Sequence, residues 1–352
     1  MFTSFKRAAS VVVTTFTGLA LLSSTAVAQQ NAEALLEFNY GIPNANHASV
    51  FVAQDLGLFE KVGLKPKFFV FQSGAPLLAG LKSESLDVVT AGLALALALG
   101  QNIPLKFIFW EANSAVSEGL VVDPKSGIKS YRDLAKAKKI AAATGTCAQV
   151  ALYMMAKKAG IDYSKLDVVN LPAPLFRNSF MSDSIDAGVA WPPFSLQLQS
   201  EGYPVVSFDG EYTPPGGLCP GLTAARPTYL KQHPEIGLKL VQVEAMAREA
   251  IAKNPQIAID AYIKRQQLAA EVAKAVVERE CCDRGIPSFA QQLDSKSPYS
   301  MTTKEGGLAE KLYIAIEALH AMKAIPEKIS LSVIQEAVDP TYLRQYLKTT
   351  GK

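Results

Sequence analysis

The side chains that usually perform catalysis are sparse in this sequence and form no recognisable pattern. Its three histidines, His47, His233 and His320, are far apart, and there is no G-x-S-x-G, H-E-x-x-H or glycine-rich phosphate-binding motif. Cys147 follows a Thr-Gly-Thr turn at the start of a predicted helix, a position that favours a reactive thiolate. No His or Asp lies near it in the sequence to act as a base. The pattern therefore favours a protein that is not an enzyme.

The four cysteines, Cys147, Cys219, Cys281 and Cys282, do not match a metal or redox motif, because the chain has no C-x-x-C. An exported chain could oxidise one pair, but the spacing does not say which. The adjacent Cys281 and Cys282 would join each other only with strain. The sequence therefore favours partly buried thiols and predicts no metal site and no cofactor.

Residues 1–28 have the features of a secretory signal peptide. Lys6 and Arg7 precede an apolar segment, residues 8–22, and the small-residue triplet Ala26-Val27-Ala28 predicts cleavage before Gln29. The apolar segment is too short to serve as a final membrane anchor. No Cys stands at the predicted cleavage site to carry a lipid. We expect export and a soluble mature protein, located in the periplasm if the source is a Gram-negative bacterium.

The mature chain is almost electrically neutral. The whole sequence has 35 Lys and Arg against 32 Asp and Glu, and two of the basic residues belong to the predicted signal peptide. The remaining residues contain no basic run, so the charge excludes a typical nucleic-acid-binding surface. The longest apolar stretch, Val88–Leu99, is too short to span a membrane.

The hydrophobic pattern predicts short strands that alternate with helices, followed by helices alone. The predicted strands lie at 36–40, 67–71, 86–89, 105–110, 120–122, 140–143, 168–171, 187–190 and 204–206. Predicted helices at 233–251, 257–262, 269–280 and 308–322 form a C-terminal tail. Such alternation indicates an α/β architecture with largely parallel sheets. Ser73 is expected to be the N-cap of a helix that extends to Leu81.

Several segments, taken in order, resemble the substrate-binding proteins of sulfonate, taurine and nitrate importers. Residues 57–64, GLFEKVGL, are similar to that family's G-x-F-x-x-x-G-L motif, and residues 81–87, LKSESLD, to its helix 2 and the following strand. Residues 128–141 resemble its S-x-x-D-L-K-G-K-K-I-A segment, although Ala137 and Lys138 replace the usual Lys-Gly. Residues 183–193 resemble its G-x-I-D-A and W-x-P stretch, and residues 226–235 the start of its first C-terminal helix.

This resemblance implies a type II periplasmic-binding-protein fold, in which two α/β lobes joined by two crossover strands close on a ligand. Lobe 1 would comprise residues 33–118 plus 210–352, and lobe 2 residues 119–209. The hinge would then lie near 117–120 and 206–212. The helical tail would belong to lobe 1.

In such a fold the ligand lies between the lobes, at the carboxyl ends of strands and the amino ends of helices. A helix N-terminus presents unpaired N–H groups that can receive an anion. Three polar turns fit this role, although ordinary helix capping would also explain them. The expected ligand-binding residues in these turns are Asn46, His47, Ser73, Gly74, Thr144, Gly145 and Thr146.

Further ligand contacts are expected from both lobes. Trp110 could stack on the organic part of a ligand, and Glu111 could recognise an amine such as that of taurine. In lobe 2, Arg177 and Asn178 begin a helix, and the guanidinium of Arg177 suits a sulfonate or carboxylate. Trp191 follows a strand and is preferred to Trp110 as a ligand contact. Core packing, hinge-surface and solvated-helix roles remain the alternatives for these residues.

Together these features favour the solute-binding protein of an ABC importer. It would be a monomer that carries an aliphatic sulfonate or taurine to a membrane permease and binds no nucleic acid. Nitrate, an aromatic carboxylate or a pyrimidine precursor are alternative ligands. An enzyme similar to the thiamine-pyrimidine synthases is the alternative of a different class, although Cys281-Cys282 is only a fragment of their cysteine-rich iron-binding run.

Overall fold

The computed structural model describes residues 34–113, 118–280 and 285–351. The predicted signal peptide, Ser117 of the first predicted hinge, and Cys281 with Cys282 lie outside the described residues. Leu35–Lys352 form one compact unit, and the description below concerns this unit. Within its described residues, no helix combines the length and the apolar character needed to cross a bilayer.

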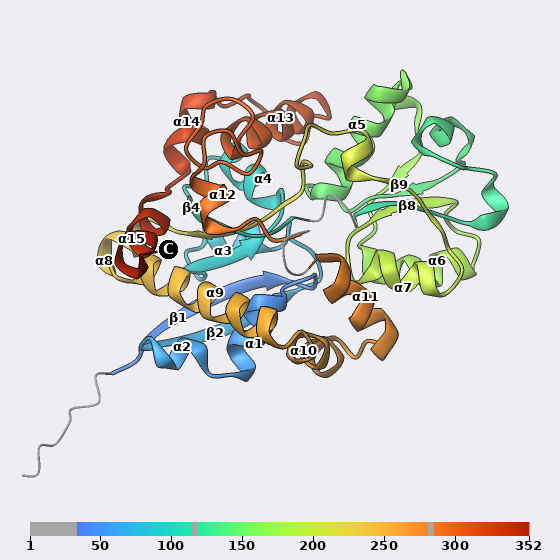
Figure 1. Ribbon diagram of the computed structural model, residues 1–352. Helices are drawn as coiled ribbons and strands as arrows, with labels where there is room; N and C mark the ends of the chain where they lie inside the picture. The colour runs from blue at the N-terminus through green and yellow to red at the C-terminus, as the bar shows by residue number, and fades with distance from the viewer. Residues whose placement is uncertain (1–33, 114–117, 281–284, 352) are drawn as a thin grey trace, which may run out of the picture. The chain divides into compact units, whose positions relative to one another are not determined.

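Two five-stranded sheets organise the unit, and each is the centre of one α/β lobe (Figure 1). The first sheet has, in spatial order, β2 (Leu64–Phe71), β1 (Leu36–Pro43), β3 (Val88–Ala91), β10 (Pro220–Ala225) and β4 (Lys106–Asn113). The second has β7 (Val168–Val169), β6 (Ile140–Ala141), β8 (Ala187–Ala190), β5 (Gly119–Val122) and β9 (Val205–Phe208). The chain crosses from the first sheet to the second between β4 and β5, and returns between β9 and β10. The lobe limits predicted from the sequence stay a prediction.

The expectation of largely parallel sheets is wrong for half of each sheet. In the first sheet β1 pairs in parallel with β2 and β3, but β10 is antiparallel to both β3 and β4. In the second, β6 is parallel to β7 and β8, but β5 is antiparallel to β8 and β9. The antiparallel strand in each sheet is the first strand after the chain arrives from the other lobe. Two parallel strands need a connection, usually a helix, that brings the chain back to the edge of the sheet where the first strand began. Strands β5 and β10 are not entered through such a connection within their own sheet. The sequence pattern did not predict β10.

Helices cover both sheets. Those whose buried residues join the core of the first sheet are α1 (Ala48–Asp55), α2 (Leu58–Lys61), α3 (Leu77–Lys82), α4 (Ala94–Gly100), α8 (Pro227–Gln232), α9 (Ile236–Lys253), α10 (Gln256–Gln266), α11 (Ala270–Glu280), α12 (Phe289–Leu293), α13 (Leu308–Ala321), α14 (Leu331–Ala337) and α15 (Thr341–Thr350). The second sheet carries α5 (Cys147–Ala159), α6 (Phe176–Met181) and α7 (Phe194–Ser200). The C-terminal helices pack back on the first lobe, with α9 and α10 on α1, and α13 on α4. In addition, α13 contacts α5 and α11 contacts α7 of the second lobe, and the assignment of the whole helical tail to lobe 1 stays a prediction.

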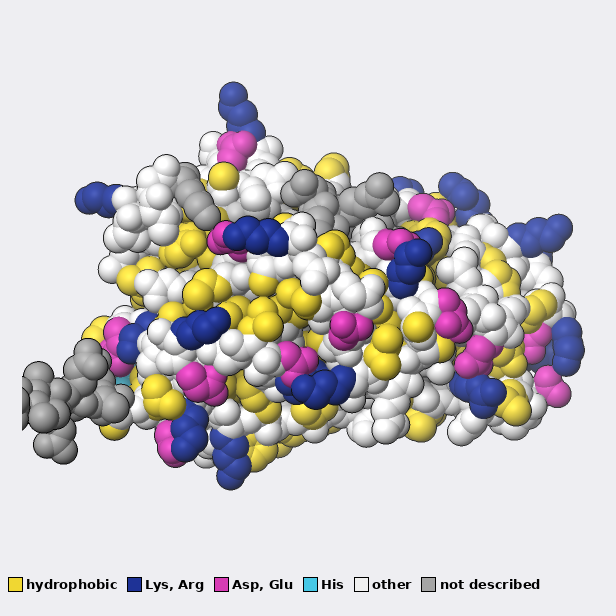
Figure 2. All heavy atoms as spheres, turned by 60° about the horizontal axis from the view of Figure 1, so that its bottom comes forward, with side chains coloured by type: hydrophobic (Ala, Val, Ile, Leu, Met, Phe, Trp, Pro, Cys, Tyr) yellow, Lys and Arg dark blue, Asp and Glu magenta, His cyan; other side chains and the backbone are white. Residues whose placement is uncertain are grey.

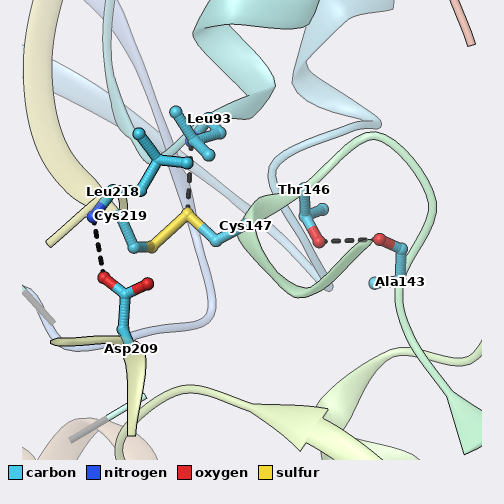
Figure 3. The surroundings of a disulfide bond; sticks show 7 residues. All are labelled: Leu93, Ala143, Thr146, Cys147, Asp209, Leu218 and Cys219. Carbon is cyan, nitrogen blue, oxygen red and sulfur yellow. Dashed lines mark hydrogen bonds between the residues drawn. A yellow bond between two sulfur atoms is a disulfide. The ribbon is translucent and has the colours of Figure 1, made fainter. Parts of the chain in front are cut away.

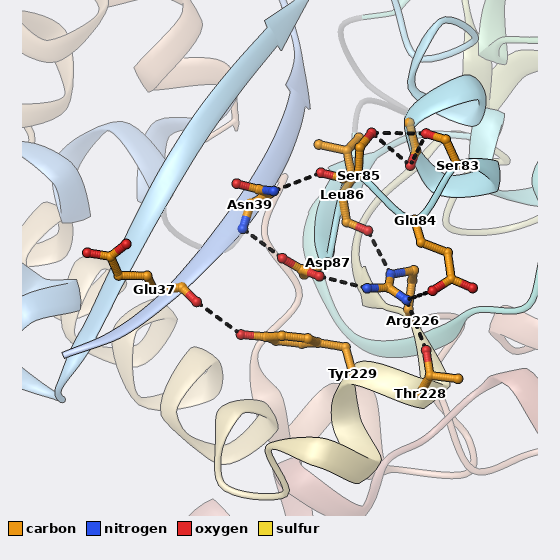
Figure 4. Close-up of polar contacts among 11 residues, drawn as sticks. Glu37, Asn39, Ser83, Glu84, Ser85, Leu86, Asp87, Arg226, Thr228 and Tyr229 are labelled. Atoms are coloured by element: carbon orange, nitrogen blue, oxygen red, sulfur yellow. Dashed lines mark hydrogen bonds and ion pairs between the residues drawn. The ribbon is translucent and has the colours of Figure 1, made fainter. Parts of the chain in front are cut away.

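The family-like segments contain two aspartates that fix strand starts by hydrogen bonds to the backbone. Asp87, just before β3, accepts a hydrogen bond from the backbone N–H of Asn39 and forms an ion pair of 2.8 Å with Arg226 (Figure 4). Arg226 also donates to the carbonyl of Leu86, so it joins the start of α8 to the start of β3. Asp186, just before β8, accepts from two consecutive backbone N–H groups at 138 and 139. In the family-like segments, these residues therefore hold the backbone of the strands in place and do not bind a ligand in the cavity.

Acidic and basic side chains are interspersed on the face shown in Figure 2, without a large patch of either sign. This distribution agrees with the nearly balanced charge of the sequence. A mixed surface of this kind offers no extended cationic track for a polyanion.

Candidate ligand-binding site

A cavity of about 60 Å³ is lined by residues from both lobes. Since a cavity needs roughly 10–15 Å³ to hold one water molecule, this cavity has room for only a few small groups. Six of the twelve predicted site residues line it: Asn46, His47, Gly74, Glu111, Thr146 and Trp191. They come from the turn before α1, the turn after β2, strand β4, the start of α5 and the turn after β8. The cavity is therefore built by the strand-to-helix turns that the sequence singled out.

His47 and Glu111 form a buried pair at one wall of the cavity. The Nδ1 atom of His47 lies 3.0 Å from Oε2 of Glu111, and both side chains are almost fully buried. The hydroxyl of Ser49 donates to the other carboxylate oxygen of Glu111 at 3.4 Å. The Nε2 atom of His47 is buried and has no hydrogen-bond partner within the described residues. A ring that donates to Glu111 through Nδ1 can use Nε2 toward a ligand, as an acceptor when neutral and as a donor when charged.

Glu118 is a cavity residue that the sequence analysis did not select. Its side chain is 0% exposed and lines the cavity, and neither carboxylate oxygen has a hydrogen-bond partner among the described residues. Burial raises its pKa well above the usual value, and the nearby carboxyl groups of Asp209 and Glu280 raise it further. It directly precedes β5, at the crossover between the lobes. A charged residue immediately before a buried strand in a predicted hinge was the signal that could have identified it.

The cavity wall is acidic. Among the described residues, its lining contains Glu111 and Glu118 but no Lys or Arg. Asp209, which follows β9, lies close enough to Glu118 to raise the pKa of that residue. Burial also raises the pKa of Asp209 itself to about 6, although the backbone N–H of Leu218 donates a hydrogen bond to its carboxylate. An anionic ligand would therefore find no cationic Lys or Arg side chain in the described lining of this cavity.

The N-terminus of α5 contributes hydrogen-bond donors, instead of carboxyl groups, to the cavity. Thr146 is the N-cap residue, yet its hydroxyl donates to the carbonyl of Ala143 instead of accepting from the helix (Figure 3). The 13-residue helix therefore begins without a side-chain cap, and its first-turn N–H groups have no intrahelical acceptors. Thr146 and Cys147 both line the cavity. This end of the cavity suits an anionic group.

Cys147 and Cys219 form a disulfide in the cavity wall (Figure 3). The expectation of free, partly buried thiols is therefore wrong for these two residues. The backbone N–H of Leu93 donates to the sulfur of Cys147 at 3.4 Å. Because both sulfurs are bonded to each other, Cys147 is not a nucleophilic thiol in this structure. Sequence spacing could not show this pairing, since 72 residues separate the two cysteines.

Trp191 contacts both lobes. It follows β8 of the second sheet, lines the cavity, and is 7% exposed. Its indole N–H donates to the backbone carbonyl of Asn44 in the first lobe at 3.4 Å. The side chain of Trp191 is therefore positioned to contact a ligand in the cavity and to bond the two lobes to each other.

The other six predicted residues lie outside the cavity lining. Trp110 is fully buried against Tyr299, because neighbouring residues of a strand point to opposite faces and its neighbour Glu111 faces the cavity. Arg177 is exposed and forms an ion pair of 2.7 Å with Glu201, and Asn178 is exposed beside it. These two lie on the solvent side of α6, so they are not positioned to bind a ligand in this cavity.

The remaining three lie in the turns that border the cavity. Ser73 is buried but is not an N-cap residue, because α3 begins at Leu77 and Pro76 takes that position. Thr144 is exposed and its N–H is bound by Asn170. The N–H of Gly145 donates to the side chain of Gln149 at 2.7 Å, so this N–H is not free for a ligand.

Known proteins share this architecture. A "Putative aliphatic sulfonates-binding protein" of Bacillus subtilis (strain 168) is 28% identical over 223 residues, which are 62% of this chain and 66% of that protein, just under two thirds. The alkanesulfonate-binding protein SsuA from Xanthomonas axonopodis pv. citri, solved bound to MOPS, has a TM-score of 0.71 at 18% identity, covering 87% of this chain and 99% of SsuA. The periplasmic nitrate-binding protein NrtA from Synechocystis PCC 6803 has a TM-score of 0.70 at 12% identity, covering 90% and 89%.

An enzyme also has this fold. The desulfurization enzyme DSZB has a TM-score of 0.61 at 13% identity, covering 90% of this chain and 99% of the enzyme. At such low identities these structures share the fold, and their ligands and activities differ. The family model described as "NMT1/THI5 like" matches residues 44–258, which is more than half of the sequence. This match shows the family, and the chain belongs to the NMT1/THI5-like family.

Proposed function

We propose that this protein is the solute-binding component of an ABC importer and that it captures a small organic sulfonate, with taurine as the leading candidate. The observation that carries this proposal is the cavity between the two lobes, whose lining includes both the uncapped N-terminus of α5 and Trp191. The mature protein would reside in the periplasm and deliver its ligand to a membrane permease. The sulfonate-binding names of the relatives support this assignment.

Binding would combine two physical effects. The first-turn N–H groups of α5 would hydrogen bond to sulfonate oxygens, with the positive end of the helix dipole adding to the attraction. Closure of the lobes would remove the ligand from water, which strengthens these interactions. Nitrate, an aromatic carboxylate and a pyrimidine precursor are the competing ligands. A cavity of about 60 Å³ favours the smallest of the organic candidates.

A thermal-shift screen tests the proposal directly. Purified protein is heated with sulfonates, carboxylates, nitrate and pyrimidines, and the melting temperature is recorded for each compound. A rise with short sulfonates, followed by a Kd from calorimetry and recovery of unchanged ligand, would support the assignment. A rise only with nitrate, carboxylates or pyrimidines would overturn the sulfonate assignment.

The variant Trp191→Ala tests the location of the site. It should weaken ligand binding, while Trp191→Phe should retain much of the affinity by keeping an aromatic ring. Arg177→Ala is the matched control, since its exposed side chain lies outside the cavity. Unchanged affinity in Trp191→Ala would contradict the proposed site.

The enzymatic alternative rests on the shared fold of DSZB. In the state described here, the disulfide blocks the one cysteine that the sequence analysis considered as a nucleophile. Turnover of a bound compound, detected by mass spectrometry, would favour an enzyme. Retention of iron by the purified protein would favour a synthase-like protein.

A further inference from the structure

Glu118 differs from the other carboxyl groups buried around the cavity because its side chain has no hydrogen-bond partner in the part of the chain that the structure describes. Glu244 is paired with Arg248 at 2.6 Å, Glu280 accepts from the amide of Asn46 at 2.6 Å, and Asp209 accepts from the N–H of Leu218 at 2.8 Å. Both oxygens of Glu118 are instead buried without a donor from residues 34–113, 118–280 or 285–351. Buried polar groups are normally hydrogen bonded, so an orphan carboxyl group in a cavity wall indicates a missing donor.

The charges around Glu118 define what this donor can be. Asp209 and Glu280 lie close enough to act on it electrostatically, and Glu111 lines the same cavity. His47 is the cavity residue that can carry a positive charge, and its Nδ1 atom already contacts Glu111. A second anion beside Glu118 would raise the pKa of this carboxyl group further, whereas a cationic N–H donor would stabilise its charged form and lower the pKa again.

Because Glu111 is paired with His47, it is less available than Glu118 to accept a hydrogen bond from an amine of the ligand. Glu111 has contacts at both oxygens, from His47 and from Ser49. Glu118 has none and lies in the lining of the same cavity. The role that the sequence suggested for Glu111 is thus better filled by Glu118.

The cavity lining brings together two features that prefer opposite charges. The N-terminus of α5 attracts an anionic group, and Glu118, with a carboxylate oxygen within 4.8 Å of the sulfur of Cys147 at the start of α5, attracts a cationic one. Thr146, at that N-terminus, and Glu118 both line the cavity, whose small volume limits the ligand to a short molecule. A short ligand that carries an anionic group and an ammonium group satisfies both features at once.

We propose that Glu118 binds a protonated amine of the ligand, so that the protein selects short zwitterions over simple anions of the same size. This inference rests on the proposed binding function and specifies its ligand class. The sulfonate or carboxylate of the zwitterion would lie at α5, and the ammonium group would donate to the Glu118 carboxylate.

Three sulfonates with the same two-carbon chain test the amine contact. Taurine, isethionate and ethanesulfonate end in an ammonium group, a hydroxyl and a methyl group respectively. Calorimetry is performed on the whole mature protein, on Glu118→Gln, and on Glu201→Gln. Glu201 is a control carboxyl group, since it is paired with Arg177 on the surface outside the cavity.

The unsubstituted protein should bind taurine at least tenfold more tightly than isethionate or ethanesulfonate. Glu118→Gln should reduce this preference to about threefold or less, while Glu201→Gln should keep it. Equal binding of the three sulfonates by the unsubstituted protein would overturn the inference and leave the sulfonate-binding function intact. Persistence of the preference in Glu118→Gln would also overturn it. If Glu118→Gln fails to fold, the preference of the unsubstituted protein for taurine over isethionate and ethanesulfonate still tests whether the site selects zwitterions.

β-Alanine and ethanolamine separate this inference from the proposed sulfonate function. If no sulfonate binds but either amine binds and loses at least tenfold in affinity in Glu118→Gln, the amine contact is supported and the sulfonate assignment fails. If the unsubstituted protein binds none of the five compounds, both proposals are overturned.

Discussion

Cys147 and Cys219 join the two lobes covalently beside the cavity. Cys147 is the first residue of α5, whose following residues pack into the core of the second sheet, and Cys219 directly precedes β10 of the first sheet. The disulfide therefore crosses the same boundary that Trp191 crosses by its hydrogen bond to Asn44. In a protein that closes on its ligand, such a bond restricts how far the lobes can separate.

Removal of this disulfide should have two measurable effects. The double substitution Cys147→Ser/Cys219→Ser should lower the free energy of unfolding by up to about 4 kcal/mol, because the loop of 72 residues gains entropy in the unfolded chain. It should also accelerate ligand dissociation, since the lobes can open further. Denaturant titration and stopped-flow Trp fluorescence measure these effects. An unchanged dissociation rate in a folded, less stable variant would show that the disulfide stabilises the fold without limiting lobe opening.

Arg226 should matter for stability and not for binding. Its guanidinium is mostly buried, pairs with Asp87, and donates to the carbonyl of Leu86, so Arg226→Ala leaves a partly buried carboxylate and a carbonyl without their donor. We expect a loss of about 2 kcal/mol in the free energy of unfolding and an unchanged Kd. Arg177→Ala, which removes an exposed ion pair, should cost less than about 1 kcal/mol. A changed Kd in a folded Arg226→Ala protein would contradict a purely structural role.

The fold could be predicted from the sequence because strand–helix alternation is a local signal and the family-like segments recur in order. Asp87 and Asp186 each stand directly before a strand, where the segments place them, although the backbone N–H groups that they bind lie 47 or 48 positions away in the sequence. The direction of β10 and β5 could not be predicted, because it depends on the route of the chain between lobes and not on any local period.

The candidate site could be predicted only in part, for a related reason. The turns at His47 and Thr146 precede helices, so their position at the cavity follows from the fold. Glu118 and the disulfide depend on contacts between residues far apart in the sequence. Arg177 illustrates the converse: its chemistry suits an anion, but its position on α6 directs it to solvent, where Glu201 binds it.

The pair His47 and Glu111 should be energetically coupled. His47→Ala removes the group 3.0 Å from a buried carboxylate, and we expect a loss of roughly 1–3 kcal/mol in the free energy of unfolding. Glu111→Gln in the same background should then cost less than it does alone, because the partner is already absent. A double-mutant cycle by denaturant titration measures this coupling. Additive effects would show that the two side chains do not stabilise each other.

Asp209 should make the protein more stable in mild acid. Burial raises its pKa to about 6 in the folded protein, against a usual value of 3.8. The folded state therefore binds a proton more readily than the unfolded state, and this contribution to stability is fully present below pH 3.8 and is lost as pH rises through 6. Between pH 7.5 and pH 5 the free energy of unfolding should increase by about 1 kcal/mol from this group. Glu118, whose pKa is also raised, acts in the same direction.

Asp209→Asn isolates this contribution, because its amide oxygen can still accept from Leu218 but the side chain no longer titrates. The window ends at pH 5 because Glu37, whose pKa is lowered by its hydrogen bond to Lys65, titrates below it. Unfolding is measured by denaturant titration at pH 5, 6 and 7.5. The variant should show a flatter pH dependence than the unsubstituted protein, both because Asp209 is absent and because Glu118 loses a charged neighbour. Parallel pH profiles for the two proteins would mean that the Asp209 carboxyl group titrates at an ordinary pH in the folded state.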